Sequence, residues 1–164
     1  MATTTTAVSG DKDIVEISEH NLPSLETVSQ LVQDDTAGAI ATFSGLTRDT
    51  FQGKKVVRLD YEAYIPMATK VLHDLIKEAR ENWAVKHVAI YHRIGTVPVG
   101  QVSVVVAVSS AHRREGLRAT EYLIDRLKDR CPIWKKEVYE DGSVWKGACE
   151  GCRFNKHTHS NNNN

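Results

Sequence analysis

The most constraining feature of the sequence is the alternation of β-rich runs, mostly in pairs, with amphipathic helices. β-Rich stretches occupy residues 14–17, 38–43, 55–64, 87–92, 102–108, 133–139 and 144–147, and helical spacing of apolar residues occupies 23–32, 67–83 and 112–130. Asp141-Gly142, between the last two β-rich runs, is a strong hairpin signal. Strand pairs interrupted by helices predict an α+β fold with a mostly antiparallel sheet.

A single domain is expected, because 164 residues suit one hydrophobic core. Residues 1–12 are small, polar and without periodicity, which predicts a disordered N-terminus. Residues 13–148 carry the expected strands and helices and form the predicted domain. Residues 149–164 are predicted to be a flexible polar tail. Within the domain, residues 44–55 are expected to form a loop, and the region of Pro98 and Gly100 a turn.

The charge balance limits the kinds of partner that the chain can have. Lys plus Arg and Asp plus Glu number 21 each, so a global basic field for nucleic acid is absent. No apolar run approaches the ~20 residues that span a bilayer. The segment from Met1 to Gly10 is rich in Thr and lacks the pattern of a targeting segment. These observations predict a cytosolic protein that binds neither nucleic acid nor membranes.

The three cysteines do not predict a disulfide framework, since their number is odd and no secretory signal precedes them. Cys149 and Cys152 form a CxxC pair, and His157 and His159 follow it. These residue types could bind zinc, but a single CxxC pair is a weak signal, and incidental thiols in a tail are the simpler interpretation. We therefore expect no metal site.

Basic residues are concentrated in one part of this neutral chain. Residues 112–136 contain eight Lys and Arg against four Asp and Glu, a difference of +4. A solvated helix face with ion pairs would explain this excess, and so would a site for a small anion. His112 and Arg113 favour the anion site, because they lie at a helix start, where free backbone N–H groups bind anions and where cations are otherwise disfavoured. Alternatively, their side chains point to water.

Three lysines near the end of the same segment could also reach a site. Lys128 lies at the border of the apolar stripe of the helix, where it is either a surface residue or partly buried and reactive. Lys135 and Lys136 lie within a predicted strand and must face opposite sides. Periodicity does not decide which of these two enters a covered environment.

The length of the helix separates these candidates. A helix rises ~1.5 Å per residue, so His112 and Lys128 lie about 24 Å apart along it. No small ligand bridges that distance. If both ends of the helix serve one site, two chains must contribute to it, as in an isologous dimer with two equal sites.

Five motifs in register resemble a known family. They are Phe43-Ser44-Gly45-Leu46-Thr47-Arg48, Tyr61-Glu62-Ala63-Tyr64 with Met67-Ala68, His92-Arg93-Ile94-Gly95, Ser110-Ala111-His112-Arg113, and Pro132-Ile133-Trp134-Lys135-Lys136-Glu137 with Trp145. The chain from about residue 38 to 146 thereby resembles the large, catalytic subunit of molybdopterin synthase. This resemblance implies an α/β-hammerhead type of fold with an additional antiparallel subdomain.

The resemblance also implies a reaction and its partners. Large subunits of this family form the homodimeric core of a heterotetramer, in which each copy binds a small ubiquitin-like sulfur-carrier subunit. The carrier ends in Gly-Gly as a thiocarboxylate, and its tail inserts into a pocket of the large subunit. The implied substrate is cyclic pyranopterin monophosphate, which two sulfur transfers convert to the molybdopterin dithiolene of the molybdenum cofactor. The implied enzyme is a sulfurtransferase without a metal or redox cofactor.

Site residues carry over from the matching motifs, one position at a time. The resemblance places the pterin-binding pair on His112 and Arg113, which reach across the dimer in the family. It places the essential lysine near the helix end on Lys128, the motif lysine on Lys135, and the arginine after the first Gly loop on Arg48. His112, Arg113 and Arg48 would hold the phosphate. Lys128 and Lys135 would bind substrate and assist the reaction by acid-base catalysis or charge stabilisation.

Two other classes of function remain open on the sequence alone. A small α+β module that binds RNA or a nucleotide is favoured slightly by the basic helix and opposed by the neutral total charge. A scaffold that only recruits a ubiquitin-like partner would tolerate changes at His112, Arg113 and Lys135.

Overall fold

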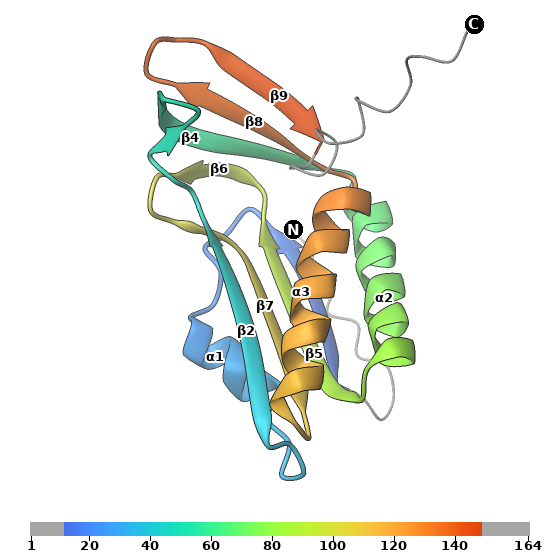
Figure 1. Ribbon diagram of the computed structural model, residues 1–164. Coiled ribbons are helices and arrows are strands. Elements are labelled where there is room, and N and C mark those ends of the chain that lie inside the picture. The colour runs from blue at the N-terminus through green and yellow to red at the C-terminus, as the bar shows by residue number, and fades with distance from the viewer. Residues whose placement is uncertain (1–11, 149–164) are drawn as a thin grey trace, which may run out of the picture.

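The computed structural model describes residues 12–148, which form two sheets and three helices (Figure 1). The first sheet has the strand order β1 (Asp13–Ser18), β5 (Val85–Arg93), β7 (Val102–Ser110) and β2 (Ala39–Leu46). Within it, β1 and β5 run parallel, while β5 with β7 and β7 with β2 run antiparallel. The predicted α+β fold with a mostly antiparallel sheet is confirmed.

Helices cover both faces of the first sheet (Figure 1). The helices α2 (Ile65–Asn82) and α3 (Arg113–Arg130) lie on one face, and the short α1 (Leu25–Leu31) lies on the other. Side chains along a strand alternate between faces, so Val106 packs on the α2–α3 side and Val105 on the α1 side. This double coverage explains why the central parts of β5 and β7, Val88–Tyr91 and Val104–Val108, are continuously apolar.

The second sheet lies across one end of the first (Figure 1). It has the order β3 (Thr50–Phe51), β4 (Lys54–Ala63), β8 (Ile133–Tyr139) and β9 (Val144–Ala148), and β6 (Gly95–Pro98) also pairs with β4. This sheet is the antiparallel subdomain that the resemblance implied. Gly142, at φ +78°, turns the β8–β9 hairpin at the predicted Asp141-Gly142 position.

Two segments that were expected to be irregular contain strands. The predicted loop at 44–55 includes the end of β2, all of β3 and the start of β4, and the predicted turn region near Pro98 includes β6. Both β3 and β6 are short and exist through pairing with β4, which their own sequence does not reveal. The first helix starts at Leu25 rather than Pro23, because the Ser24 hydroxyl caps it by accepting from the Thr27 amide.

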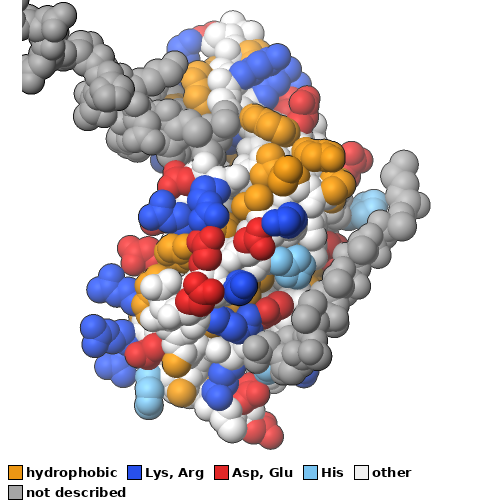
Figure 2. Space-filling view, turned by 90° about the vertical axis from the view of Figure 1, so that its right-hand side faces the viewer, with side chains coloured by type: hydrophobic (Ala, Val, Ile, Leu, Met, Phe, Trp, Pro, Cys, Tyr) orange, Lys and Arg blue, Asp and Glu red, His pale blue; other side chains and the backbone are white. Residues whose placement is uncertain are grey.

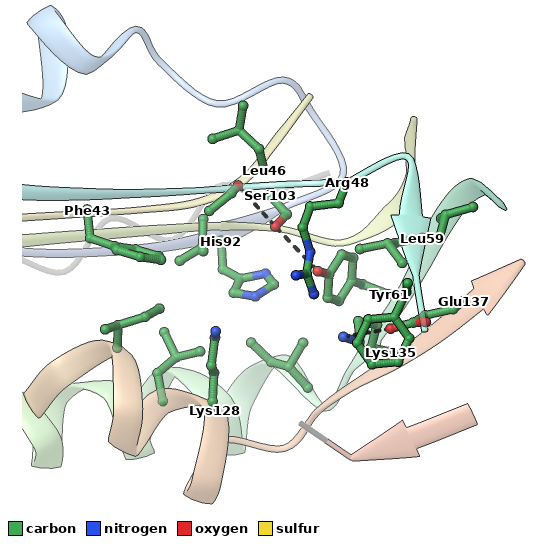
Figure 3. Close-up of a pocket in the computed structure, with 17 residues that line it drawn as sticks. Phe43, Leu46, Arg48, Leu59, Tyr61, His92, Ser103, Lys128, Lys135 and Glu137 are labelled. Atoms are coloured by element: carbon green, nitrogen blue, oxygen red, sulfur yellow. Dashed lines mark hydrogen bonds and ion pairs between the residues drawn. The ribbon is translucent and has the colours of Figure 1, made fainter. Parts of the chain in front are cut away.

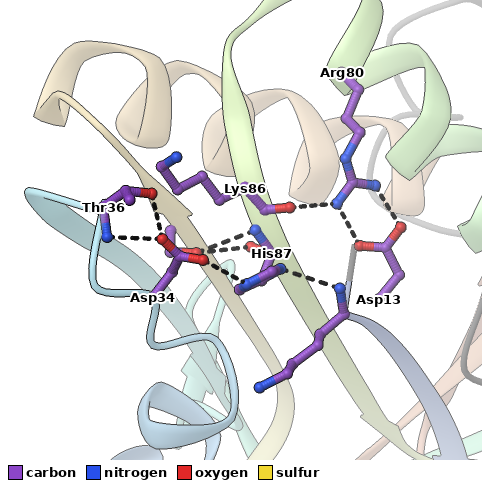
Figure 4. Close-up of polar contacts among 8 residues, drawn as sticks. Asp13, Asp34, Thr36, Arg80, Lys86 and His87 are labelled. Atoms are coloured by element: carbon purple, nitrogen blue, oxygen red, sulfur yellow. Dashed lines mark hydrogen bonds and ion pairs between the residues drawn. The ribbon is translucent and has the colours of Figure 1, made fainter. Parts of the chain in front are cut away.

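Two groups of hydrogen bonds hold the start of the parallel edge strand β1 (Figure 4). Arg80 of α2 donates from both terminal nitrogens to the Asp13 carboxylate. The buried His87 accepts the Lys12 amide at Nδ1, 3.0 Å away, so its Nε2 carries the proton that it donates to Asp34 Oδ2 at 3.2 Å. These bonds fix β1 against β5 and α2.

Some predictions concern residues outside the described range. They are the disorder of residues 1–11, the flexible tail at 149–164, and any role of Cys149, Cys152, His157 and His159. None of the helices in the described part of the chain combines the length and apolar character that crossing a bilayer requires.

Candidate active site

A pocket of about 120 Å³ lies where the two sheets meet the C-terminal end of α3 (Figure 3). Strands β2, β5 and β7 of the first sheet form one wall, strands β4 and β8 of the second sheet form another, and α3 closes a third side. The lining consists of Phe43, Gly45, Leu46, Arg48, Phe51, Val56, Leu59, Tyr61, His92, Ser103, Val104, Ile124, Leu127, Lys128, Ile133, Lys135 and Glu137. The space exceeds the ~10–15 Å³ that one water needs several times over, so a slender ligand group can enter.

Three cationic side chains from three separate elements converge on this pocket. Arg48 follows β2 in the link to the second sheet, and its guanidinium carbon lies 5.5 Å from the centroid of the Phe51 ring. Lys128 comes from the last turn of α3 and is half-buried. Lys135 comes from β8. A partly open pocket lined by three cations, of which Arg48 is exposed and Lys128 half-buried, suits an anionic ligand.

A buried ion pair fixes the position of Lys135. Its Nζ lies 3.0 Å from Glu137 Oε1, with only 12% of the lysine side chain and 4% of the glutamate side chain exposed. The Tyr139 hydroxyl donates to the other oxygen of Glu137. The Lys135 ammonium also lies 5.8 Å from the Trp145 ring centroid, within range of a cation–π interaction. Of the two adjacent strand lysines, Lys135 and not Lys136 lines the pocket.

The register of β8 on β4 explains this orientation. Tyr61 lies opposite Lys135 and Leu59 opposite Glu137 in the antiparallel pair, and all four side chains line the pocket. Because side chains alternate along a strand, Lys136 lies on the other side.

Two polar features of the pocket were not identified from the sequence as parts of a site. The sequence assigns no role to Glu137, although its i,i+2 spacing from Lys135 places both residues on one side of a strand. The Tyr61 hydroxyl donates to Ser103 Oγ at 3.3 Å, and Ser103 in turn donates to the Gly45 carbonyl at 3.4 Å. These bonds link the second sheet to the first across the pocket.

His92, another polar group of the pocket that the sequence alone does not single out, is almost fully buried at the pocket wall. Burial lowers the pKa of its imidazole to about 4, although the bond to the Arg93 carbonyl opposes this shift. Its Nδ1 lies 2.8 Å from that carbonyl oxygen, which can only accept, so Nδ1 carries the proton. His92 is therefore a neutral imidazole at pH 7. The signal in the sequence is a histidine directly after the apolar run from Val88 to Tyr91.

His112 and Arg113 lie at the opposite end of α3, and neither lines the pocket. His112 is the N-cap residue and Arg113 the first residue of the helix, and both are exposed. The Ser110 hydroxyl donates to the His112 carbonyl at 2.7 Å and holds the start of the helix. One chain thus brings Arg48, Lys128 and Lys135 together and keeps His112 and Arg113 apart from them.

Part of the basic excess on α3 is a solvated face with ion pairs. Figure 2 shows Lys, Arg, Asp and Glu side chains interspersed on the side of the molecule that α2 and α3 form. Arg118 lies 3.6 Å from Glu121, and Arg130 lies 2.7 Å from Glu78 of α2. The described residues contain no cluster of His, Cys, Asp and Glu that could hold a metal ion.

The fold and the pocket together define an α+β protein with a lysine-containing site for an anion at the junction of two sheets. A sequence profile for the MoaE protein family matches residues 17–130. The human molybdopterin synthase catalytic subunit is 50% identical over 139 residues, which cover 85% of this chain and 73% of the human protein. A crystal structure of molybdopterin synthase from Staphylococcus aureus is 41% identical and superposes with a TM-score of 0.74, covering 80% of this chain and 95% of that one.

A third relative shares the fold alone. It is a chain in a protein–protein complex of subunits 1 and 2 of the molybdopterin-converting factor from Helicobacter pylori, with 20% identity, a TM-score of 0.67, and coverage of 81% of this chain and 89% of that one. The chain described here belongs to the MoaE family of molybdopterin synthase catalytic subunits. It is accordingly an enzyme of molybdenum cofactor biosynthesis.

Proposed function

We propose that this subunit transfers sulfur from the thiocarboxylated C-terminus of a small ubiquitin-like subunit to cyclic pyranopterin monophosphate, forming the molybdopterin dithiolene. The observation that carries this proposal is the convergence of Arg48, Lys128 and Lys135 on one pocket. Both the thiocarboxylate and the phosphate are anions, and cations in a pocket of low dielectric stabilise them more than they would in water. We place the reaction in the cytosol, as the sequence suggested.

The reaction divides into two kinds of step, the transfer of sulfur to the substrate and the hydrolysis of the bond that still joins that sulfur to the carrier tail. In the first transfer, the thiocarboxylate sulfur attacks the side-chain carbon that carries one ester oxygen of the cyclic phosphate, so a C–S bond replaces that C–O bond and the phosphate stays on its other ester oxygen as a terminal phosphate. In the second transfer, a second thiocarboxylate sulfur replaces the oxygen on the neighbouring carbon, and that oxygen leaves as water. Water then cleaves the acyl–sulfur bond, leaving a carboxylate on the carrier tail and sulfur on the substrate. Lys128 and Lys135 would stabilise the negative charge that develops in these steps and exchange protons with the reacting groups. Lys135 is held for this role by Glu137.

His112 and Arg113 join this scheme only if a second copy supplies them. In a homodimer, the start of α3 from one copy would meet the pocket of the other, and these two residues would hold the phosphate together with Arg48. Two such sites, each with one carrier subunit, make the heterotetramer that we propose.

Reconstitution tests the function directly. The purified chain, a thiocarboxylated small subunit and cyclic pyranopterin monophosphate should yield the dithiolene product. Lys128→Ala and Lys135→Ala should lower turnover by at least about 100-fold, the lower range for a lost acid–base group. Lys136→Ala, next to Lys135 on the opposite side of the strand, should retain near wild-type turnover. Full activity of Lys128→Ala would contradict the assignment.

Mixing of subunits tests the shared site. Lys128→Ala homodimers and His112→Ala homodimers should both be inactive. After random reassociation, half of the dimers are mixed, and each of these has one site with both residues intact, so activity should return to about one quarter of the wild-type level. If mixing restores nothing although mixed dimers form, His112 does not act across the dimer.

A further inference from the structure

We propose that His92 binds the inserted tail of the carrier subunit by accepting a backbone N–H of its last two residues. The proposal rests on the function proposed above, because that function supplies the Gly-Gly tail. It assigns to a buried histidine of the pocket a role in recognising the partner rather than in proton transfer.

The size of the pocket favours a peptide tail over the pterin as its occupant. At about 120 Å³ it is well below the ~300–1,000 Å³ of sites that enclose a drug-sized molecule. Two glycines form the most slender peptide, since they carry no side chains. The phosphate-bearing pterin would then lie at the mouth of the pocket, where a second copy could supply His112 and Arg113.

A tail in this pocket needs hydrogen-bond acceptors. A peptide N–H that leaves water must find an acceptor, because an unpaired buried donor is costly. Arg48, Lys128 and Lys135 are donors and cannot fill this role. Two other side-chain acceptors of the lining are already engaged, since Glu137 accepts from Lys135 and Tyr139, and Ser103 accepts from Tyr61.

His92 lines the pocket and has an unprotonated ring nitrogen whose lone pair can accept a hydrogen bond from a peptide N–H. Its Nδ1 donates to the Arg93 carbonyl at 2.8 Å, so Nε2 is the unprotonated nitrogen, and no described residue hydrogen bonds to it. Figure 3 shows the ring projecting into the space between Lys128 and Arg48. The Tyr61 ring, edge-on at 5.2 Å between centroids, supports the imidazole from the side of the second sheet.

The protonation state supports the same role. Because burial holds the pKa of His92 near 4, the Nε2 lone pair is available throughout the neutral range. A group with such a pKa is a poor general base at pH 7 but a good acceptor of a hydrogen bond. The proposal therefore predicts that loss of His92 weakens tail binding more than it slows the chemical steps.

A double-mutant cycle between His92 and the tail isolates the proposed bond. The carrier subunit is made by semisynthesis in its carboxylate form, with the last or the penultimate peptide bond replaced by an ester, which lacks the N–H. On the wild-type enzyme, one of the two esters should weaken binding by about tenfold, the range for one hydrogen bond. His92→Phe should bind the all-amide carrier about tenfold more weakly and should lose nothing further with that ester.

The controls separate this bond from general damage and from failure of the function. His87→Phe removes a buried imidazole outside the pocket and should leave carrier affinity unchanged even where it lowers stability. The proposal would be overturned if the ester weakened carrier binding to wild type and to His92→Phe by the same factor. It would also be overturned if His92→Phe raised the KM for the pterin and left carrier affinity unchanged. If wild-type protein neither binds the Gly-Gly carrier nor makes dithiolene, the proposed function itself fails.

Discussion

The buried pair of Lys135 and Glu137 allows a sharp prediction about stability. Changing Glu137 to Gln keeps the size and shape of the side chain and removes its negative charge. The Lys135 ammonium then stays in a site that is 12% exposed and loses the carboxylate oxygen that lies 3.0 Å from it. The Tyr139 hydroxyl also loses its charged acceptor, since the amide offers one oxygen where the carboxylate offered two.

The loss of folding free energy expected for Glu137→Gln depends on how deeply the ion pair is buried rather than on the distance between its two charged atoms. Removing one member of a buried ion pair costs about 3–5 kcal/mol, because the remaining charge is left unsolvated. We expect the lower end, about 3 kcal/mol, because the remaining amide oxygen can still accept one bond and some water reaches Lys135. The exposed pair of Lys70 and Asp74 is closer, at 2.8 Å, but its side chains are 71% and 50% exposed. Asp74→Asn should therefore cost only about 0.3–0.5 kcal/mol.

Urea denaturation at pH 7 and one protein concentration compares the two variants. With an m-value of about 1–3 kcal/mol/M, Glu137→Gln should lower the midpoint by roughly 1–3 M. Asp74→Asn should shift the midpoint by only a few tenths of a molar unit at most. Equal losses in the two variants would refute the argument that burial determines the contribution of these pairs.

Three further predictions concern the scaffold. The bond from Arg130, and secondarily that from Tyr122, holds the pKa of Glu78 at about 2, so the pair stabilises the fold above about pH 4.5 and its contribution is lost as pH falls toward 2. Glu78→Gln should flatten that part of a stability–pH curve, and an unchanged slope would contradict the assignment. Gly116→Ala should lower Tm, because the new Cβ would lie 2.6 Å from Ser110 Oγ, and overpacking of roughly 1–3 kcal/mol exceeds a helix-propensity gain of ~1 kcal/mol. Ser24→Ala removes the cap of α1 and should cost about 1 kcal/mol in the same melting assay, whereas Ser24→Gly should cost only a few tenths.

Much of the fold was readable from the sequence where local signals and packing agree. The helix α3 follows its apolar stripe and ends at Arg130, just before Pro132, and the strand β8 has the predicted bounds. By contrast, β3 and β6 were missed, because two- and four-residue strands have no periodicity to detect and form only against β4. Their pairing is a property of the tertiary structure.

The candidate site was only partly readable, for a related reason. Alternation in β8 showed that one of Lys135 and Lys136 is covered, but the choice depends on which side of β8 faces the first sheet. Only the resemblance, and then the structure, could favour Lys135. His92 was missed because a histidine among apolar strand residues is ordinarily a satisfied core residue. The surroundings of its second nitrogen depend on how the two sheets and α3 pack around the pocket, which the sequence does not describe.

The position of the pocket at the junction of the two sheets explains why its polar residues come from several elements. Arg48 comes from the link between the sheets, Lys128 from a helix of the first layer, and Lys135 from the second sheet, so their spacing depends on how the sheets dock. The bond between Tyr61 and Ser103 spans that junction. A purely apolar contact would allow the sheets to slide, because apolar packing is not directional, whereas a hydrogen bond fixes both distance and angle. We therefore infer that Tyr61→Phe would alter catalysis more than stability, since it removes one weak bond of 3.3 Å between the second sheet, which carries Lys135, and the first sheet, on which α3 packs with Lys128.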